Sequence, residues 1–183
     1  MQHIVLIGFM GAGKTTIGKK LARKADREFI DTDEMIETQT GEKISDIFAV
    51  NGEAYFRKLE TGVLRQLIEK QENCVIAVGG GLPMQPDNHP LLKQMGTVVY
   101  LQAETDTLVQ RLKNDKSRPK LQGGNLRERI EALMNEREAT YRKISNVSVV
   151  TDHRRYGEIV QEIMEKTGMA EEDATEQAAE SYL

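Results

Sequence analysis

Five short apolar runs punctuate the chain, and each is followed by sequence that is compatible with a helix. Within these runs the apolar residues are continuous instead of alternating with polar ones, which is typical of strands buried on both faces. Strands of a parallel sheet are buried in this way when helices cover both sides. The pattern therefore predicts an α/β fold, a three-layer sandwich around a five-stranded parallel sheet. The runs are HIVLI (3–7), EFID (28–31), CVIAV (74–78), TVVYL (97–101) and VSVVT (147–151).

The chain of 183 residues is short enough for one domain, because single cores commonly hold about 100–200 residues. We expect residues 1–167 to form this domain and residues 168–183 to be a flexible tail. The tail contains five acidic residues and no Lys or Arg, so the rest of the chain sums to +1. Between two helical patterns, the stretch 113–125 is polar and Gly-rich, which predicts a mobile loop.

Composition and charge narrow the class of protein. A hydrophobic content of 39% with 30% charged residues is ordinary for a soluble globular protein. The net charge of −4 argues against a general nucleic-acid binder. No apolar run approaches the roughly 18 residues that span a membrane, and the start of the chain leads directly into a motif. We therefore expect a cytoplasmic protein with no membrane partner, in which the lone Cys74 is a buried, inert thiol.

A phosphate-binding motif follows the first predicted strand. The stretch GFMGAGKTT matches G-x-x-x-x-G-K-[ST] through Gly8, Gly13, Lys14 and Thr15. Its glycines allow backbone N–H groups to converge on phosphate oxygens, and the helix that follows directs the positive end of its dipole there. Lys14 would contact the β- and γ-phosphates and Thr15 would coordinate Mg²⁺. The predicted ATP-binding segment comprises Gly11, Ala12, Gly13, Lys14, Thr15 and Thr16.

Two aspartates follow the second predicted strand. Asp31 and Asp33 are two residues apart, so an extended backbone would direct both side chains to the same side. Ligands of open α/β sheets bind beyond the carboxyl ends of the strands, which predicts one acid for Mg²⁺ and the other for a phosphoryl acceptor. An alternative is that Asp33 caps a helix that begins near Glu34.

The third predicted strand ends in Gly79, Gly80 and Gly81, where a substrate could lie against bare backbone. A tight turn without a ligand is the alternative interpretation. Arg57 precedes Glu60 by three residues on a predicted helix, so the acid can orient the guanidinium as a clamp for a carboxylate.

Two further arginines are candidates for charge stabilisation. Arg137 could supply a second fork for a carboxylate, although its helix is crowded with charge and a solvated face is the usual explanation of such a pattern. Arg118 lies within the polar loop, and an arginine on a closing lid can neutralise charge on a transferred phosphoryl group.

Taken together, these motifs resemble shikimate kinase in order and spacing from Met1 to about Lys166. The resemblance implies a P-loop fold of the nucleoside-monophosphate-kinase type, a lid at about residues 112–124, and ATP-dependent phosphorylation of the 3-hydroxyl of shikimate. The motifs are GFMGAGKTT, DTD (31–33), GEAYFRKLE (52–60), the triple glycine (79–81), SRP (117–119) and EREATYR (136–142).

The resemblance also implies roles for particular residues. Asp33, Arg57, Gly80 and Arg137 would contact shikimate, with Gly79 and Gly81 beside them. Asp31 and Thr15 would lie on the magnesium side. Lys14, Asp33 and Arg118 would be catalytic, Arg118 as the lid arginine on the ATP phosphates. The adenine would lie near Arg111 and either Arg154 or Arg155.

Two departures from the family pattern affect the lid and the adenine site. Lys120 stands where an apolar residue is common, and the segment HRRYG (153–157) lacks a proline often found there.

Other acceptors, such as gluconate or a nucleoside monophosphate, remain open, as does a nucleotide-dependent switch that transfers no phosphate. The paired arginines favour a small carboxylate. We expect ATP and shikimate as the only partners of a monomer, with Mg²⁺ as the cofactor.

Overall fold

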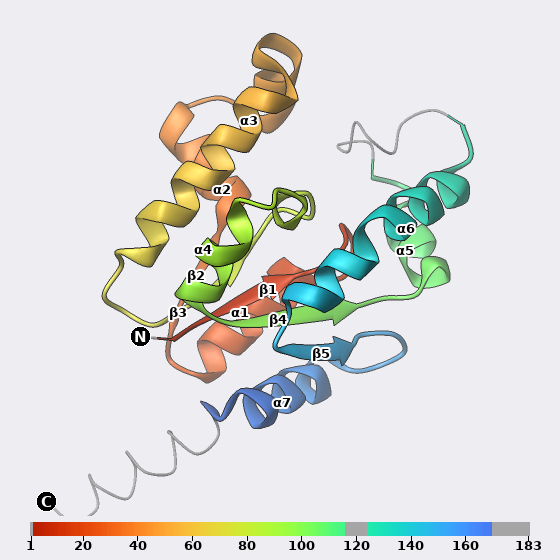
Figure 1. Cartoon of the computed structure of the whole chain (residues 1–183). Coiled ribbons are helices and arrows are strands. Elements are labelled where there is room, and N and C mark those ends of the chain that lie inside the picture. The colour runs from red at the N-terminus through yellow and green to blue at the C-terminus, as the bar shows by residue number, and fades with distance from the viewer. Residues whose placement is uncertain (1, 116–123, 170–183) are drawn as a thin grey trace, which may run out of the picture.

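The computed structural model describes residues 2–115 and 124–169. Five parallel strands form one sheet in the order β2-β3-β1-β4-β5, and helices cover both faces (Figure 1). Each strand lies within one residue of its predicted bounds, so the predicted α/β class and parallel sheet are confirmed. The strands are β1 (His3–Ile7), β2 (Glu28–Asp31), β3 (Cys74–Ala77), β4 (Gly96–Gln102) and β5 (Val147–Val150).

Two apolar layers fill the space between the sheet and its helices. Strand residues alternate between them, so Ile4 and Leu6 pack on one side of β1 whereas Val5 and Ile7 pack on the other. Helices α1 and α7 cover the first face, and α2, α3 and α4 cover the second (Figure 1). The helices are α1 (Lys14–Lys24), α2 (Thr32–Thr40), α3 (Ile44–Ile68), η1 (Leu82–Met84), α4 (Asn88–Met95), α5 (Thr105–Leu112), α6 (Leu126–Ile144) and α7 (Tyr156–Thr167).

The order of the strands places three chain segments at one end of the sheet. All strands run parallel, so the segments that follow β1, β2 and β3 emerge from the same end. From β1 the chain continues to β2 and β3 on one side of β1, and from β3 it crosses to β4 on the other side. Ligands of open α/β sheets bind at such reversals. The glycine-rich motif, the two aspartates and the triple glycine are therefore neighbours in space.

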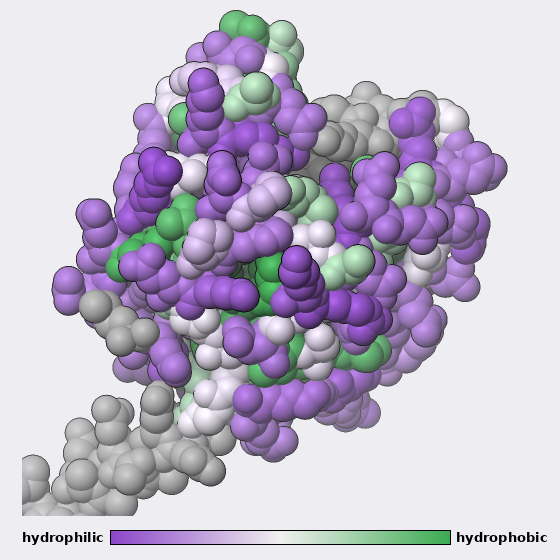
Figure 2. All heavy atoms as spheres, viewed as in Figure 1, coloured by the Kyte–Doolittle hydropathy of each residue, from purple (hydrophilic) through white to green (hydrophobic). Residues whose placement is uncertain are grey.

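The helices and the visible surface differ in where apolar residues gather. None of the helices within residues 2–115 and 124–169 is both long and apolar enough to cross a bilayer. Figure 2 shows a largely hydrophilic face on which apolar residues lie in small, separate groups, one of them at the tip of α3. Cys74 is buried, as its apolar surroundings in the sequence predict.

Candidate active site

The phosphate-binding motif forms a backbone cradle between β1 and α1. Gly13 precedes α1 with a φ of 98°, a left-handed conformation that favours glycine. Gly8 has a φ of 143°, and a Cβ added there would lie 2.6 Å from the carbonyl oxygen of Leu101. No side chain caps α1, and its first turn carries no acidic residue. The first N–H groups of the helix are therefore suited to bind an anion.

Lys14 and Thr15 begin α1 beside this cradle. The Nζ atom of Lys14 donates to the carbonyl oxygens of Gly8 and Phe9 at 2.9 and 3.0 Å, so the ammonium lies over the loop. The Oγ1 hydroxyl of Thr15 donates to Oδ2 of Asp31 at 2.9 Å. A hydroxyl and a carboxylate oxygen thus face each other, and oxygen ligands of this kind suit Mg²⁺.

These two oxygens are a partial set of ligands for a metal ion. Within the part of the chain that the structure describes, no three His, Cys, Asp or Glu side chains gather. Mg²⁺ commonly takes one or two protein ligands and completes its shell with water and substrate phosphates. Thr15 and Asp31 therefore fit an ion that arrives with a nucleotide, and their role as metal ligands stays a prediction.

The structure corrects the predicted geometry of the two aspartates. Asp31 ends β2 and is the N-cap of α2, because its Oδ1 atom accepts a hydrogen bond from the backbone N–H of Asp33 at 3.0 Å. Asp33 therefore lies within the first turn of α2. The expectation that one extended backbone carries both acids is wrong. The alternative that Asp33 is the helix cap is also wrong, because Asp31 is the cap. A helix begins one residue after the strand because Asp31 satisfies an early N–H group.

Despite this correction, both carboxylates lie at the same end of the sheet. Asp31 faces Thr15, whereas Asp33 faces the triple glycine. A Cβ added at Gly79 would lie 2.8 Å from Oδ1 of Asp33 and 3.0 Å from Oε1 of Glu60. Glycine at this position leaves room for two acids against bare backbone.

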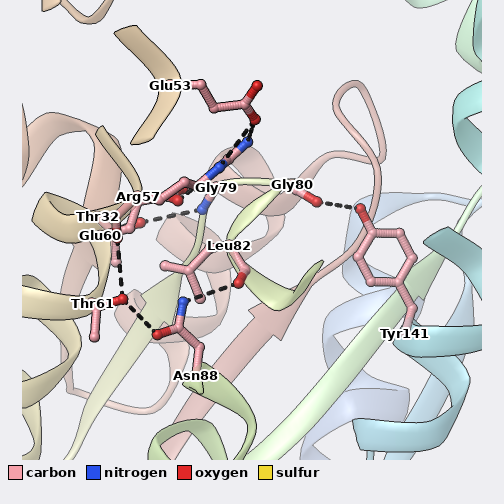
Figure 3. A network of polar contacts seen from close by, with 10 residues as sticks. All are labelled: Thr32, Glu53, Arg57, Glu60, Thr61, Gly79, Gly80, Leu82, Asn88 and Tyr141. Carbon is pink, nitrogen blue, oxygen red and sulfur yellow. Dashed lines mark hydrogen bonds and ion pairs between the residues drawn. The ribbon is translucent and has the colours of Figure 1, made fainter. Parts of the chain in front are cut away.

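Arg57 is held by two glutamates of its own helix (Figure 3). Its NH1 atom donates to Oε2 of Glu60 at 2.6 Å, and its Nε and NH2 atoms donate to Oε1 of Glu53 at 3.2 and 2.6 Å. The sequence predicted the contact with Glu60 but not the one with Glu53, although a spacing of four residues on a helix is the signal for it. Gly52, with φ of 77° and ψ of 174°, interrupts α3 just before this cluster.

Glu60 is almost fully buried beneath the guanidinium, with 1% of its surface exposed. Burial raises the pKa of this carboxyl to about 7, although the Arg57 charge opposes the rise. Oε1 of Glu60 has no hydrogen-bond partner among the described residues. One oxygen of Glu60 thus holds the Arg57 guanidinium, and the other points toward Gly79 and Asp33, where a substrate group or water could bind.

Two side-chain hydroxyls hold the triple glycine in place, one at Gly79 and one at Gly80. The N–H of Gly79 donates to Oγ1 of Thr32 at 3.2 Å, and the carbonyl oxygen of Gly80 accepts from the Tyr141 hydroxyl at 2.5 Å (Figure 3). A Cβ added at Gly81 would lie 2.6 Å from NH2 of Arg57. The segment is an ordered platform against the clamp, and sequence reasoning did not identify its two fastening hydroxyls, which come from distant segments.

Arg137 is buried, with 4% of its surface exposed, and its guanidinium carbon lies 5.8 Å from the centre of the Phe9 ring in the phosphate loop. The interpretation of Arg137 as part of a solvated helix face is therefore wrong. The helix turns this one cation inward while its other charges face solvent. Arg137 comes from α6, Arg57 from α3, Asp33 from α2 and the glycine platform from the segment after β3, and all four lie at the same end of the sheet as the cradle.

The predicted adenine residues and the lid are placed only in part. Arg111 donates from NH1 to the carbonyl oxygen of Gly11 at 2.9 Å, so it lies beside the cradle. Arg154 bonds to Glu162 and to the carbonyl oxygen of Val150, and Arg155 is the N-cap of α7. Arg118 and Lys120 lie outside the described residues, as do most of the lid and the acidic tail.

Comparison with known proteins finds one family. A family model described as shikimate kinase matches residues 10–167. A shikimate kinase of Pelotomaculum thermopropionicum is 49% identical over 141 residues, which are 77% of this chain and 81% of that protein. A solved structure of shikimate kinase from Acinetobacter baumannii in complex with shikimate has a TM-score of 0.85 and 40% identity, with 90% of this chain and 91% of that one covered.

A more distant structure shares the fold alone. A gluconokinase of Sinorhizobium meliloti superposes with a TM-score of 0.60 at 16% identity and covers 96% of this chain and 97% of its own. The same P-loop sandwich therefore occurs with another acceptor, so the acceptor has to be argued from the site.

Proposed function

The chain belongs to the shikimate kinase family, and from that premise we propose that it transfers the γ-phosphoryl group of ATP to the 3-hydroxyl of shikimate. The acceptor oxygen forms a bond to the γ-phosphorus while the bond from that phosphorus to the bridging oxygen breaks. ADP leaves with the electron pair of the broken bond. The products are ADP, shikimate 3-phosphate and the hydroxyl proton.

On the nucleotide side, the backbone of Gly11–Thr16 binds the phosphates and Lys14 neutralises their charge. Lys14 already lies over the loop through the carbonyl oxygens of Gly8 and Phe9, so its ammonium needs only a small movement to meet a phosphate. Mg²⁺, when bound with ATP, would be held by Thr15 and Asp31 and would supply positive charge at the phosphates.

On the acceptor side, Arg57 and Arg137 bind the carboxylate of shikimate. The Arg57 guanidinium lies against Gly81 of the glycine platform, and the Arg137 guanidinium lies over Phe9 beside the cradle. Each guanidinium presents paired N–H donors that match a carboxylate. The substrate ring lies against Gly79–Gly81, where no Cβ intervenes. This pair of inward-facing cations beside a P-loop is the observation that carries the proposal.

Asp33 orients the attacking hydroxyl and accepts its proton. Its Oδ1 atom faces the glycine platform, whereas the neighbouring Asp31 is engaged with Thr15 on the nucleotide side. Two acids separated by one residue therefore serve two substrates. Proton transfer to a positioned carboxylate contributes roughly 10²- to 10⁴-fold to such reactions.

The proposal is tested by measuring ADP release with shikimate, gluconate, AMP or no acceptor, each with ATP and Mg²⁺. We expect release that depends on shikimate and on Mg²⁺, with a phosphorylated product of the expected mass. EDTA in excess of the metal should stop the reaction. Equal release without an acceptor would indicate a nucleotide hydrolase or switch, and faster release with gluconate would indicate the sugar-acid alternative.

Replacement of Gly81 by Ala should damage the acceptor site alone. Gly81 has φ of −93° and ψ of −15°, so alanine fits the backbone, but its Cβ would lie 2.6 Å from NH2 and 2.7 Å from NH1 of Arg57. The clamp must move, and we expect the KM for shikimate to rise about tenfold while the KM for ATP stays within about twofold. Gly62→Ala on α3 is the matched control, since its added Cβ meets no atom within 4 Å. An unchanged shikimate KM in Gly81→Ala would remove Arg57 from the acceptor site.

A further inference from the structure

The hydroxyl of Tyr141 lies where two parts of the acceptor site meet. It donates to the carbonyl oxygen of Gly80 at 2.5 Å (Figure 3). Arg137 lies one turn earlier on α6. Burial raises the pKa of the Tyr141 hydroxyl, although the charge of Arg137 and its hydrogen bond to this hydroxyl oppose the rise. The hydroxyl therefore stays a neutral donor at physiological pH, and its oxygen can accept from the guanidinium.

The ring that carries this hydroxyl is rigidly held. Tyr141 has no exposed surface and packs in the apolar layer of α3 and α4. Its ring centre lies 5.2 Å from that of Tyr100 on β4, with an angle of 35° between the ring planes. A buried tyrosine has few rotamers, so its oxygen is held at one point relative to the sheet.

That fixed oxygen constrains both of its neighbours. A peptide unit is planar, so a hydrogen bond to the carbonyl oxygen of Gly80 also sets the direction of the Gly81 N–H. Glycine has the largest backbone freedom of any residue, and a platform of three glycines needs such an external tie to keep one conformation. The same oxygen limits where the Arg137 guanidinium can lie.

We propose that Tyr141 is a positioning residue that couples the glycine platform to Arg137 and so aligns both with the carboxylate-bearing acceptor. The inference rests on the proposed function, because it concerns the geometry of the same site. Tyr141 itself does not touch the substrate; it acts through Gly80 and Arg137.

The test is Tyr141→Phe, which keeps the ring and removes only the hydroxyl. We expect the KM for shikimate to rise about tenfold, as for loss of one buried hydrogen bond, with kcat and the KM for ATP changed by less than about twofold. Calorimetric titration with shikimate should show the same loss of affinity. Measurements at low temperature keep a modestly destabilised variant folded, and circular dichroism verifies that it is.

Tyr100→Phe is the matched control. It removes a hydroxyl from the other ring of the same tilted pair. Tyr100 lies on β4, and Tyr141 and not Tyr100 is among the nearest neighbours of Gly80. We expect its KM for shikimate to stay within about twofold of the wild type. An equal rise of the shikimate KM in both variants would mean that any change in this pair of rings loosens the core. An unchanged shikimate KM in Tyr141→Phe would mean that the hydroxyl positions nothing. Either result overturns the inference. If the wild-type protein shows no shikimate-dependent release of ADP, the proposed function itself fails.

Discussion

Replacement of Asp33 by Asn is expected to lower kcat by roughly 10²- to 10⁴-fold, because the amide cannot accept the proton of the attacking hydroxyl. The affinity for a non-hydrolysable ATP analogue should remain within about twofold, since Asp33 faces Gly79 and the nucleotide cradle is made by another segment. Steady-state kinetics and calorimetric titration measure these two quantities. The isosteric amide leaves the shape of the site almost unchanged, so a lost rate reports on the missing charge.

Asp31→Asn is the control for this experiment. Asp31 is two residues away and carries the same group, but it accepts a hydrogen bond from Thr15 on the nucleotide side. Its replacement should raise the concentration of Mg²⁺ needed for half-maximal rate, a change that Asp33→Asn should not produce. If Asp33→Asn retained normal turnover, Asp33 would not be the acceptor of the proton. If both variants changed only the Mg²⁺ requirement, both acids would belong to the nucleotide site.

Replacement of Arg57 by Ala is expected to raise the KM for shikimate about 100-fold, because hydrogen bonds to a charged group contribute about 1.5–3 kcal/mol. The KM for ATP should change by less than about twofold, since Arg57 lies against Gly81 and is not part of the nucleotide cradle. Loss of the guanidinium also removes the charge that lowers the pKa of Glu60, so this buried carboxyl becomes more fully protonated near pH 7. Neutralisation of Glu60 limits the cost in stability.

Arg65→Ala provides the comparison, since Arg65 lies two turns farther along α3 and borders the same groove of about 610 Å³ beside Arg57. We expect no change in the KM for shikimate beyond about twofold, because Arg65 does not face the glycine platform. Equal increases in both variants would place the acceptor in the outer groove and away from Gly79–Gly81. Equal effects of Arg57→Ala on shikimate and ATP would mean that Arg57 is no carboxylate clamp.

The sequence carries a stronger signal for the inward-facing Arg57 than for the inward-facing Arg137. Arg57 has an acidic partner three residues away, and a helix brings such residues together whatever the rest of the chain does. Arg137 has no comparable local signal, and its sequence neighbours are charged residues of an exposed helix face. Arg137 is buried where its guanidinium lies over the Phe9 ring of the phosphate loop. This contact depends on the packing of segments more than a hundred residues apart.

The sequence by itself determined the class of fold, the P-loop and the family, because these depend on local patterns. Continuous apolar runs specify buried strands, and a glycine-rich turn with Lys14 and Thr15 specifies a phosphate cradle wherever it stands. Only the tertiary structure decided that Asp31 and not Asp33 caps α2, that Arg137 is buried and that Tyr141 fastens Gly80. Helix caps, the burial of a charged side chain and hydrogen bonds between distant segments depend on which groups come close in space. Those groups meet only when the chain is folded.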